Sequence, residues 1–229
     1  MRNNQRFIAR WTAVSILAQS STAVLAFIAV AASWAGVLPV ILLEACLLGV
    51  GQRWALRRAS VGLERGWLAA TAAGMIVGRY VQFGADTSAA ASTVAAWPSF
   101  VQIVVGAVLG SIVGAIMAAP QWYVLAGRVP RAWRWIVVRS AAWAAALPAL
   151  MIVGSWLAAV SGAGLGVLVA TMFGSFALVG AFVGLVEGIG LASLIRFAAG
   201  WESHTTDTPG NVGRLAGSLA GPTLGGQPK

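Results

Sequence analysis

Long apolar runs separated by short polar segments constrain this chain more than any other feature. The runs cover about 11–33, 36–56, 66–84, 100–126, 135–160 and 165–197. A helix needs roughly 20 residues to cross the hydrocarbon core of a bilayer, and the runs are of about this length or longer. Only 9% of the residues are charged, whereas roughly a quarter of a soluble domain is charged. The sequence therefore predicts an all-α integral membrane protein with six transmembrane helices.

The basic residues indicate how these helices are oriented. All 15 Lys and Arg residues except Arg79 lie in the N-terminal segment, the 57–65 and 127–134 loops, the C-terminal tail or the adjoining helix ends. Cytoplasmic loops of membrane proteins carry an excess of Lys and Arg. Both termini are therefore predicted to be cytoplasmic, in a bacterial inner membrane. Nucleic acid is not an expected partner, because the arginines form short clusters and not one basic domain.

The two ends of the chain call for separate interpretations. A basic start followed by the apolar stretch 23–32 also has the ingredients of a signal peptide. The polar residues 19–22 divide the apolar core of this run, which favours a retained helix. Residues 201–229 are rich in Gly, Pro, Ser and Thr and are predicted to form a disordered cytoplasmic tail.

One pattern recurs in three of the predicted helices. Gln52, Gln121 and Glu187 each follow small residues by three, six and seven positions and precede a leucine by four. Small residues at this spacing share a helix face, so each copy offers a groove that leads to a single polar group. The nearly equal intervals between the copies fit an internal repeat of two-helix units.

The repeat also predicts how the bundle closes. After Gln52 and Gln121, a basic loop leads to a tryptophan that begins the return helix, whereas no apolar run follows Glu187. The first run begins with Trp11 and is predicted to supply the missing return helix. The expected fold is a pseudo-threefold repeat of helical hairpins in which the N- and C-terminal helices pair to close the ring. The three polar residues would then form one layer near its cytoplasmic end.

Intramembrane charges are expected to face a partner inside the bundle. Gln52 and Gln121 are interpreted mainly as packing residues, while Glu187 is a candidate functional carboxylate that stays protonated or pairs with Arg139. Glu44 and Arg79 lie at similar depths on neighbouring helices, which predicts a second ion pair. Alternatively, Arg79 extends to the outer surface and Glu44 is protonated.

Glycines and tryptophans give broader signals. Glycines at four-residue spacing predict close helix packing, within the bundle or against another protein. They are Gly74, Gly78, Gly106, Gly110, Gly114, Gly180, Gly184 and Gly188. Most tryptophans are interpreted as interface anchors, including Trp11, Trp54, Trp67, Trp122, Trp133 and Trp135. Trp143 and Trp156 are candidates for contact with a lipid or pigment.

No residue set predicts catalysis or a bound cofactor. The one histidine, His204, lies outside the predicted spans, so histidine-ligated haem and bacteriochlorophyll are not expected. The sequence has no Cys/His cluster for a metal, no Walker-type loop and no set of residues for a Ser-His-Asp triad. The single cysteine, Cys46, lies in an apolar run.

The segment around the second polar residue carries a resemblance. Residues 121–125 read Gln-Trp-Tyr-Val-Leu, and residues 52–57 read Gln-Arg-Trp-Ala-Leu-Arg. This pattern resembles uncharacterised bacterial multi-pass membrane proteins with Gly-rich helices, Gln-Trp-x-x-Leu-Arg and a Trp-led helix. The resemblance covers the second to fifth spans and implies a membrane location and a repeat. The third copy departs from it, with Glu187-Gly188 in place of Gln-Trp.

Three functions are compatible with these features. The favoured one is a non-catalytic accessory or scaffold subunit whose glycine faces pack against a larger membrane complex. The first alternative is a small-solute or ion transporter or channel with a polar layer at Gln52, Gln121 and Glu187. The second is a lipid- or pigment-binding membrane subunit. A sealed centre would favour the scaffold, and a water-filled centre reaching Glu187 would favour transport.

Overall fold

The computed structural model describes residues 2–32, 37–59, 66–86, 97–159 and 164–206, and their secondary structure is helical. The helices are α1 (Arg2–Ala32), α2 (Val37–Arg58), α3 (Trp67–Asp86), α5 (Ser99–Ala126), α6 (Arg134–Ala159) and α7 (Leu165–Thr206). Within the described residues, four segments are long and apolar enough to cross a membrane. They are Leu38–Arg58, Ser99–Ala126, Arg134–Trp156 and Gly166–Phe197. The chain is therefore an all-helical protein suited to a membrane.

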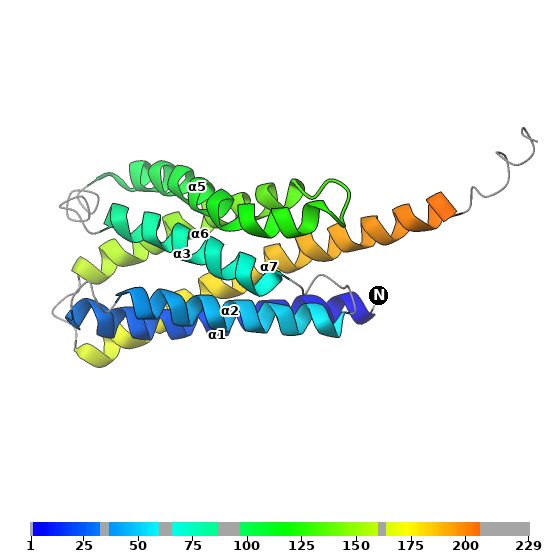
Figure 1. Cartoon of the computed structure of the whole chain (residues 1–229). Coiled ribbons are helices and arrows are strands. Elements are labelled where there is room, and N and C mark those ends of the chain that lie inside the picture. The colour runs from blue at the N-terminus through cyan, green and yellow to red at the C-terminus, as the bar shows by residue number, and fades with distance from the viewer. Residues whose placement is uncertain (1, 33–36, 60–65, 87–96, 160–163, 207–229) are drawn as a thin grey trace, which may run out of the picture.

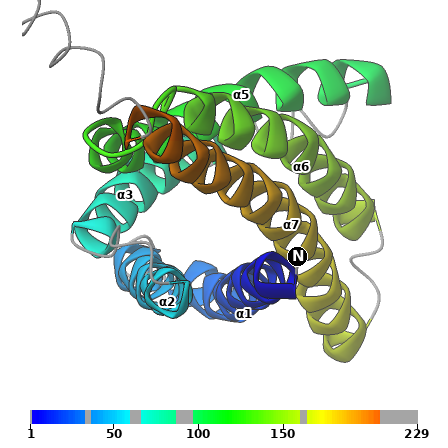
Figure 2. The ribbon, with the colours of Figure 1, turned by 90° about the vertical axis from the view of Figure 1, so that its right-hand side faces the viewer.

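The six helices are arranged in a closed cycle. α2 packs against α1 and α3, α5 packs against α3 and α6, and α7 packs against α6 and α1. Figure 2, viewed along the bundle, shows the N-terminal helix lying beside α7. The first and last helices are thus neighbours, as the sequence predicts. The ends of α2 and α5 and the starts of α1, α3 and α6 gather at one end of the bundle, here called the basic end, and α7 runs past this end (Figure 1).

Two helices extend beyond their predicted limits. α1 begins at Arg2, nine positions before the predicted start at residue 11, because Phe7 on its first turns is buried against Trp11 with 5.6 Å between ring centroids. α7 continues to Thr206 over 42 residues, six residues into the segment predicted as a tail. The remainder of that tail, 207–229, lies outside the described residues. Pro98 precedes α5, as expected for a proline at a helix start.

The glycine faces are used inside the bundle. A Cβ on Gly74 would lie 2.4 Å from the Met117 carbonyl oxygen, one on Gly110 would lie 2.1 Å from the Trp143 carbonyl oxygen, and one on Gly180 would lie 2.8 Å from the Ser15 carbonyl oxygen. The glycines at four-residue spacing on α3 thus face α5, those on α5 face α6, and those on α7 face α1. The other glycines of these faces are Gly78, Gly106, Gly114, Gly184 and Gly188, the last in looser contact. These faces are therefore already occupied by this chain's own helices.

Candidate functional site

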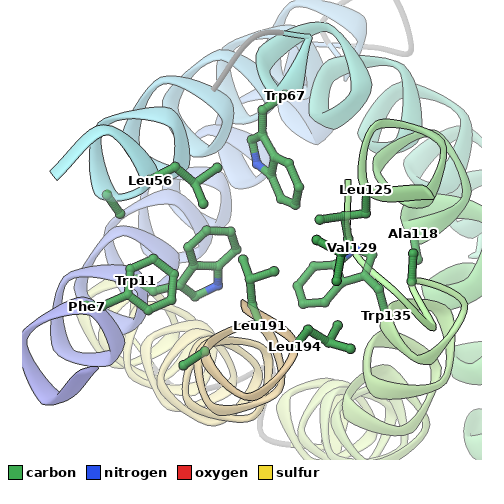
Figure 3. Close-up of a cluster of buried hydrophobic side chains, with 13 residues drawn as sticks. Phe7, Trp11, Leu56, Trp67, Ala118, Leu125, Val129, Trp135, Leu191 and Leu194 are labelled. Carbon is green, nitrogen blue, oxygen red and sulfur yellow. The ribbon is translucent and has the colours of Figure 1, made fainter. Parts of the chain in front are cut away.

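Three tryptophans meet at the basic end of the bundle. Trp11 on α1, Trp67 on α3 and Trp135 on α6 are fully buried. Their ring centroids are 5.9 Å (Trp11 to Trp67), 6.2 Å (Trp11 to Trp135) and 6.1 Å (Trp67 to Trp135) apart. Figure 3 shows the three rings converging with leucines from α2, α5 and α7, namely Leu56, Leu125 and Leu191, which are also fully buried. This tryptophan triangle closes the centre of the bundle at the basic end.

Each indole N–H of the triangle donates a hydrogen bond to one of the three repeated polar residues. Trp67 donates to Gln52 Oε1 and Trp135 donates to Gln121 Oε1, each at 3.0 Å. Trp11 donates to Glu187 Oε2 at 3.4 Å. Each of the helix pairs α2/α3, α5/α6 and α7/α1 therefore contains the same kind of indole hydrogen bond. In each pair the acceptor lies on the helix that runs toward the basic end.

The three repeated polar residues are also connected to one another. The Gln121 amide donates to Thr71 Oγ1 at 2.7 Å and to Gln52 Oε1 at 3.3 Å. The Arg139 guanidinium donates to Gln121 Oε1 and, through Nε, to Glu187 Oε1, both at 2.7 Å. All five side chains are buried. The structure thus brings Gln52, Gln121 and Glu187 into one layer, and Glu187 faces inward in an ion pair with Arg139.

The hydrogen bonds of this layer do not form a complete ring among the described residues. Thr71 and Arg139 each lie four residues after a tryptophan of the triangle, and Ser15 has the same place on α1. Ser15, however, donates to the carbonyl oxygen of Trp11 at 3.1 Å. Among the described residues, Gln52 Nε2 has no hydrogen-bond partner although its side chain is fully buried. No hydrogen bond among the described residues therefore joins α1 and α2 in this layer.

A second polar cluster lies farther from the basic end. Arg79 on α3 donates from Nε to Glu44 Oε2 at 2.9 Å and from Nη2 to Glu44 Oε1. It also donates from Nη2 to Gln19 Oε1 on α1 at 2.9 Å and lies over the Trp143 ring, 5.3 Å from its centroid. All four residues are buried. Arg79 therefore does not extend to the outer surface, and the predicted pair with Glu44 is present.

These clusters determine what the bundle centre can do chemically. Two arginines and two glutamates are held there as ion pairs, so the buried charge of this region is balanced. Among the described residues no three His, Cys, Asp or Glu side chains gather to hold a metal ion. Cys46 is exposed on α2. The centre is suited to holding helices together and offers a carboxylate, Glu187, as its titratable group in the tryptophan layer.

The sequence interpretation of the tryptophans is partly wrong. Trp11, Trp67 and Trp135 were expected at the membrane interface, but they form the buried triangle. Trp143 lies under Arg79 and not at the lipid surface, whereas Trp156 is half exposed. The signal that could have identified the triangle is their shared place, at the start of three helices that follow or close the repeat.

No protein family, no curated protein and no solved structure matches this chain.

Proposed function

We propose that all six helices span a bacterial inner membrane with both termini in the cytoplasm, and that the bundle is a circularly permuted, pseudo-threefold repeat of hairpins. The shared contact of Gln52 with Trp67, Gln121 with Trp135 and Glu187 with Trp11 supports the repeat. The gathering of arginines at the basic end supports the orientation. The likeness to bacterial multi-pass proteins with the Gln-Trp pattern belongs to the same proposal.

The proposed function is that of a non-catalytic accessory or scaffold subunit in a larger membrane complex. The observation that carries this proposal is the filled centre, in which the tryptophan triangle is fully buried and the intramembrane charges are paired. A filled, charge-balanced core favours a rigid building block over a carrier. Because the glycine faces are occupied internally, a partner would have to bind outward-facing apolar side chains, of which α5 presents several: Phe100, Ile103, Val104, Val108 and Ile112.

Photo-crosslinking in the native membrane tests this proposal. A photoreactive amino acid at Ile103 on the outer face of α5 is expected to capture a membrane protein that mass spectrometry identifies. The matched control places the photoreactive amino acid at Val113, which is buried on the same helix, and should give no crosslink to another protein. If outward positions around the bundle capture nothing and the protein purifies alone in nanodiscs, the scaffold function is wrong.

Transport is a second candidate, favoured by one observation. Gln52 Nε2 and Trp143 Nε1 are buried donors without a hydrogen-bond partner among the described residues. Unpaired buried donors are costly and often mark a bound water or solute. Uptake into proteoliposomes that is present in wild type and lost in the double variant R139T/E187Q, which removes Glu187 without leaving Arg139 unpaired, would support a carrier. Visible absorbance in the same preparation would instead support a pigment-binding subunit.

A further inference from the structure

Two arginines from different helices converge on one exposed tryptophan at the basic end. The guanidinium carbon of Arg10 on α1 lies 5.5 Å from the ring centroid of Trp54, and that of Arg58 on α2 lies 5.9 Å from it. Trp54 is 44% exposed and Arg58 is exposed. Each guanidinium is attracted to the ring, but the two positive charges repel each other. An anion between the two guanidinium groups would relieve this repulsion.

The two carboxylates whose side chains the structure describes do not supply an anion here. Glu44 and Glu187 are both buried and bind Arg79 and Arg139. Arg53, which precedes Trp54, adds a third positive charge, and its Nε has no hydrogen-bond partner among the described residues. Among the residues whose side chains the structure describes, the region around Trp54 therefore combines three positive charges with an exposed aromatic ring.

An apolar stripe leads along α2 to this region. Leu43, Leu47, Val50, Trp54 and Arg58 follow one another at spacings of four, three, four and four residues, which places them on one face of the helix. The first three are exposed to the lipid side, at 45%, 43% and 57%. An acyl chain lying on this stripe would bring the headgroup of its lipid to the level of Arg10 and Arg58.

We propose that Arg10, Trp54 and Arg58 form a binding site for the phosphate of an anionic phospholipid whose acyl chain lies along Leu43, Leu47 and Val50. Guanidinium groups bind phosphate through strong, charge-assisted hydrogen bonds. A basic cluster at the membrane surface attracts anionic headgroups electrostatically. The bound lipid joins α1 to α2, the neighbouring pair for which the polar layer has no hydrogen bond among the described residues.

Native mass spectrometry of the full-length protein in detergent tests the site. Phosphatidylglycerol and phosphatidylcholine with the same acyl chains are titrated against wild type and against the variants R10Q, R58Q and R10Q/R58Q. Wild type is expected to retain phosphatidylglycerol over phosphatidylcholine, and each lost arginine should weaken phosphatidylglycerol binding about 5-fold. W54A should also weaken binding, because the ring holds both guanidinium groups.

The control variant is R131N. Arg131 lies at the same end, 5.0 Å from the Phe197 ring centroid, and its φ of 58° is one that asparagine tolerates. R131N removes one positive charge without touching Trp54 and should bind phosphatidylglycerol like wild type. Glycerol 3-phosphate distinguishes a free phosphate site from a lipid site, because it lacks the acyl chain and should not displace the lipid.

Three results would overturn the proposal. They are equal retention of both lipids by wild type, wild-type binding by R10Q/R58Q, and an R131N loss as large as that of R58Q. The substituted arginines are not buried, so folding is not expected to fail, and circular dichroism checks this. Raising the salt concentration on wild type gives an independent measurement, since a site of this kind must weaken as the charges are screened.

Discussion

Arg139 on α6 and Glu187 on α7 form a buried ion pair in the layer beneath the tryptophan triangle, with 2.7 Å between Nε and Oε1. At the preceding junction between units, the corresponding places hold Thr71 on α3 and Gln121 on α5, which form a neutral hydrogen bond of 2.7 Å. One junction of the proposed repeat therefore uses a pair of opposite charges where another uses a neutral pair. Both members of the pair differ together, which leaves no unpaired charge.

Replacing one member of this ion pair should be far more harmful than replacing both. Glu187→Gln leaves Arg139 buried without its counterion, which costs roughly 3–5 kcal/mol of unfolding free energy. The double variant R139T/E187Q recreates the Thr71 and Gln121 pair and should recover most of that loss. The measurement is unfolding by SDS in mixed micelles, followed by circular dichroism. A double variant as unstable as E187Q would contradict the equivalence of these positions.

Exchanging the charges of Glu44 and Arg79 should restore only part of the stability that is lost when one of the two residues is replaced. E44Q is expected to destabilise the protein by roughly 3–5 kcal/mol, because Arg79 is then an uncompensated buried charge. The exchanged variant E44R/R79E restores neutrality but places a carboxylate at the face of Trp143 and beside Gln19 Oε1, positions that now hold a cation. It should therefore recover less than half of the loss in the same SDS titration. Full recovery would show that Trp143 and Gln19 contribute nothing to holding Arg79.

Substitutions in the tryptophan triangle should lower the stability of the protein by graded amounts. Trp67→Phe and Trp135→Phe keep an aromatic ring and lose a 3.0 Å hydrogen bond, which costs about 0.6 kcal/mol and at most about 1.7 kcal/mol in a membrane protein. Trp11→Phe should cost less, because its bond to Glu187 is 3.4 Å long. Replacement by alanine should cost about 3–5 kcal/mol at each site, because it opens a cavity. Thermal unfolding of the six variants checks the order, and a Trp11→Phe loss greater than the other two would contradict it.

The sequence predicts the polar layer well because helix periodicity fixes which residues share a face. Gln52, Gln121 and Glu187 follow the same small residues, and the contact of Glu44 with Arg79 follows from equal rise along two neighbouring helices. The burial of Trp11, Trp67 and Trp135 was not predicted, because a tryptophan near a helix start has the same sequence signal at a lipid interface as in a bundle centre. Only the packing of the helices determines which face points inward.

The glycine faces were ambiguous for a similar reason. A glycine at four-residue spacing predicts a close approach but does not identify the approaching helix. Gly110 faces the Trp143 backbone of the next helix along the chain, while Gly180 faces Ser15, more than half the chain away. The second contact depends on the closure of the cycle, which no local pattern encodes.

Gly110→Ala tests the closest of these approaches. The added Cβ would lie 2.1 Å from the Trp143 carbonyl oxygen, so α5 and α6 must separate. Overpacking of this kind costs roughly 1–3 kcal/mol. Gly127→Ala is the matched control, because a Cβ there meets nothing within 4 Å and the residue has a φ of −78°. SDS unfolding should separate the two variants, and equal stabilities would show that α5 and α6 have room to accommodate a methyl group at Gly110.

Cysteine labelling in intact cells tests the proposed orientation, and the single native cysteine makes the background simple. Cys46 is exposed on the outer face of α2, within a segment apolar enough to cross a membrane. A membrane-impermeant maleimide should therefore fail to label it until detergent is added. On a C46S background, Gly164→Cys and Gly127→Cys place exposed thiols at opposite ends of the bundle, and a Cβ meets nothing within 4 Å at either position. Because basic residues favour the cytoplasmic side, the maleimide should label Gly164→Cys in spheroplasts directly and Gly127→Cys only after permeabilisation.

The reverse labelling pattern would show that the orientation is inverted. Direct labelling of both thiols would exclude a protein that spans the membrane with its basic end inside.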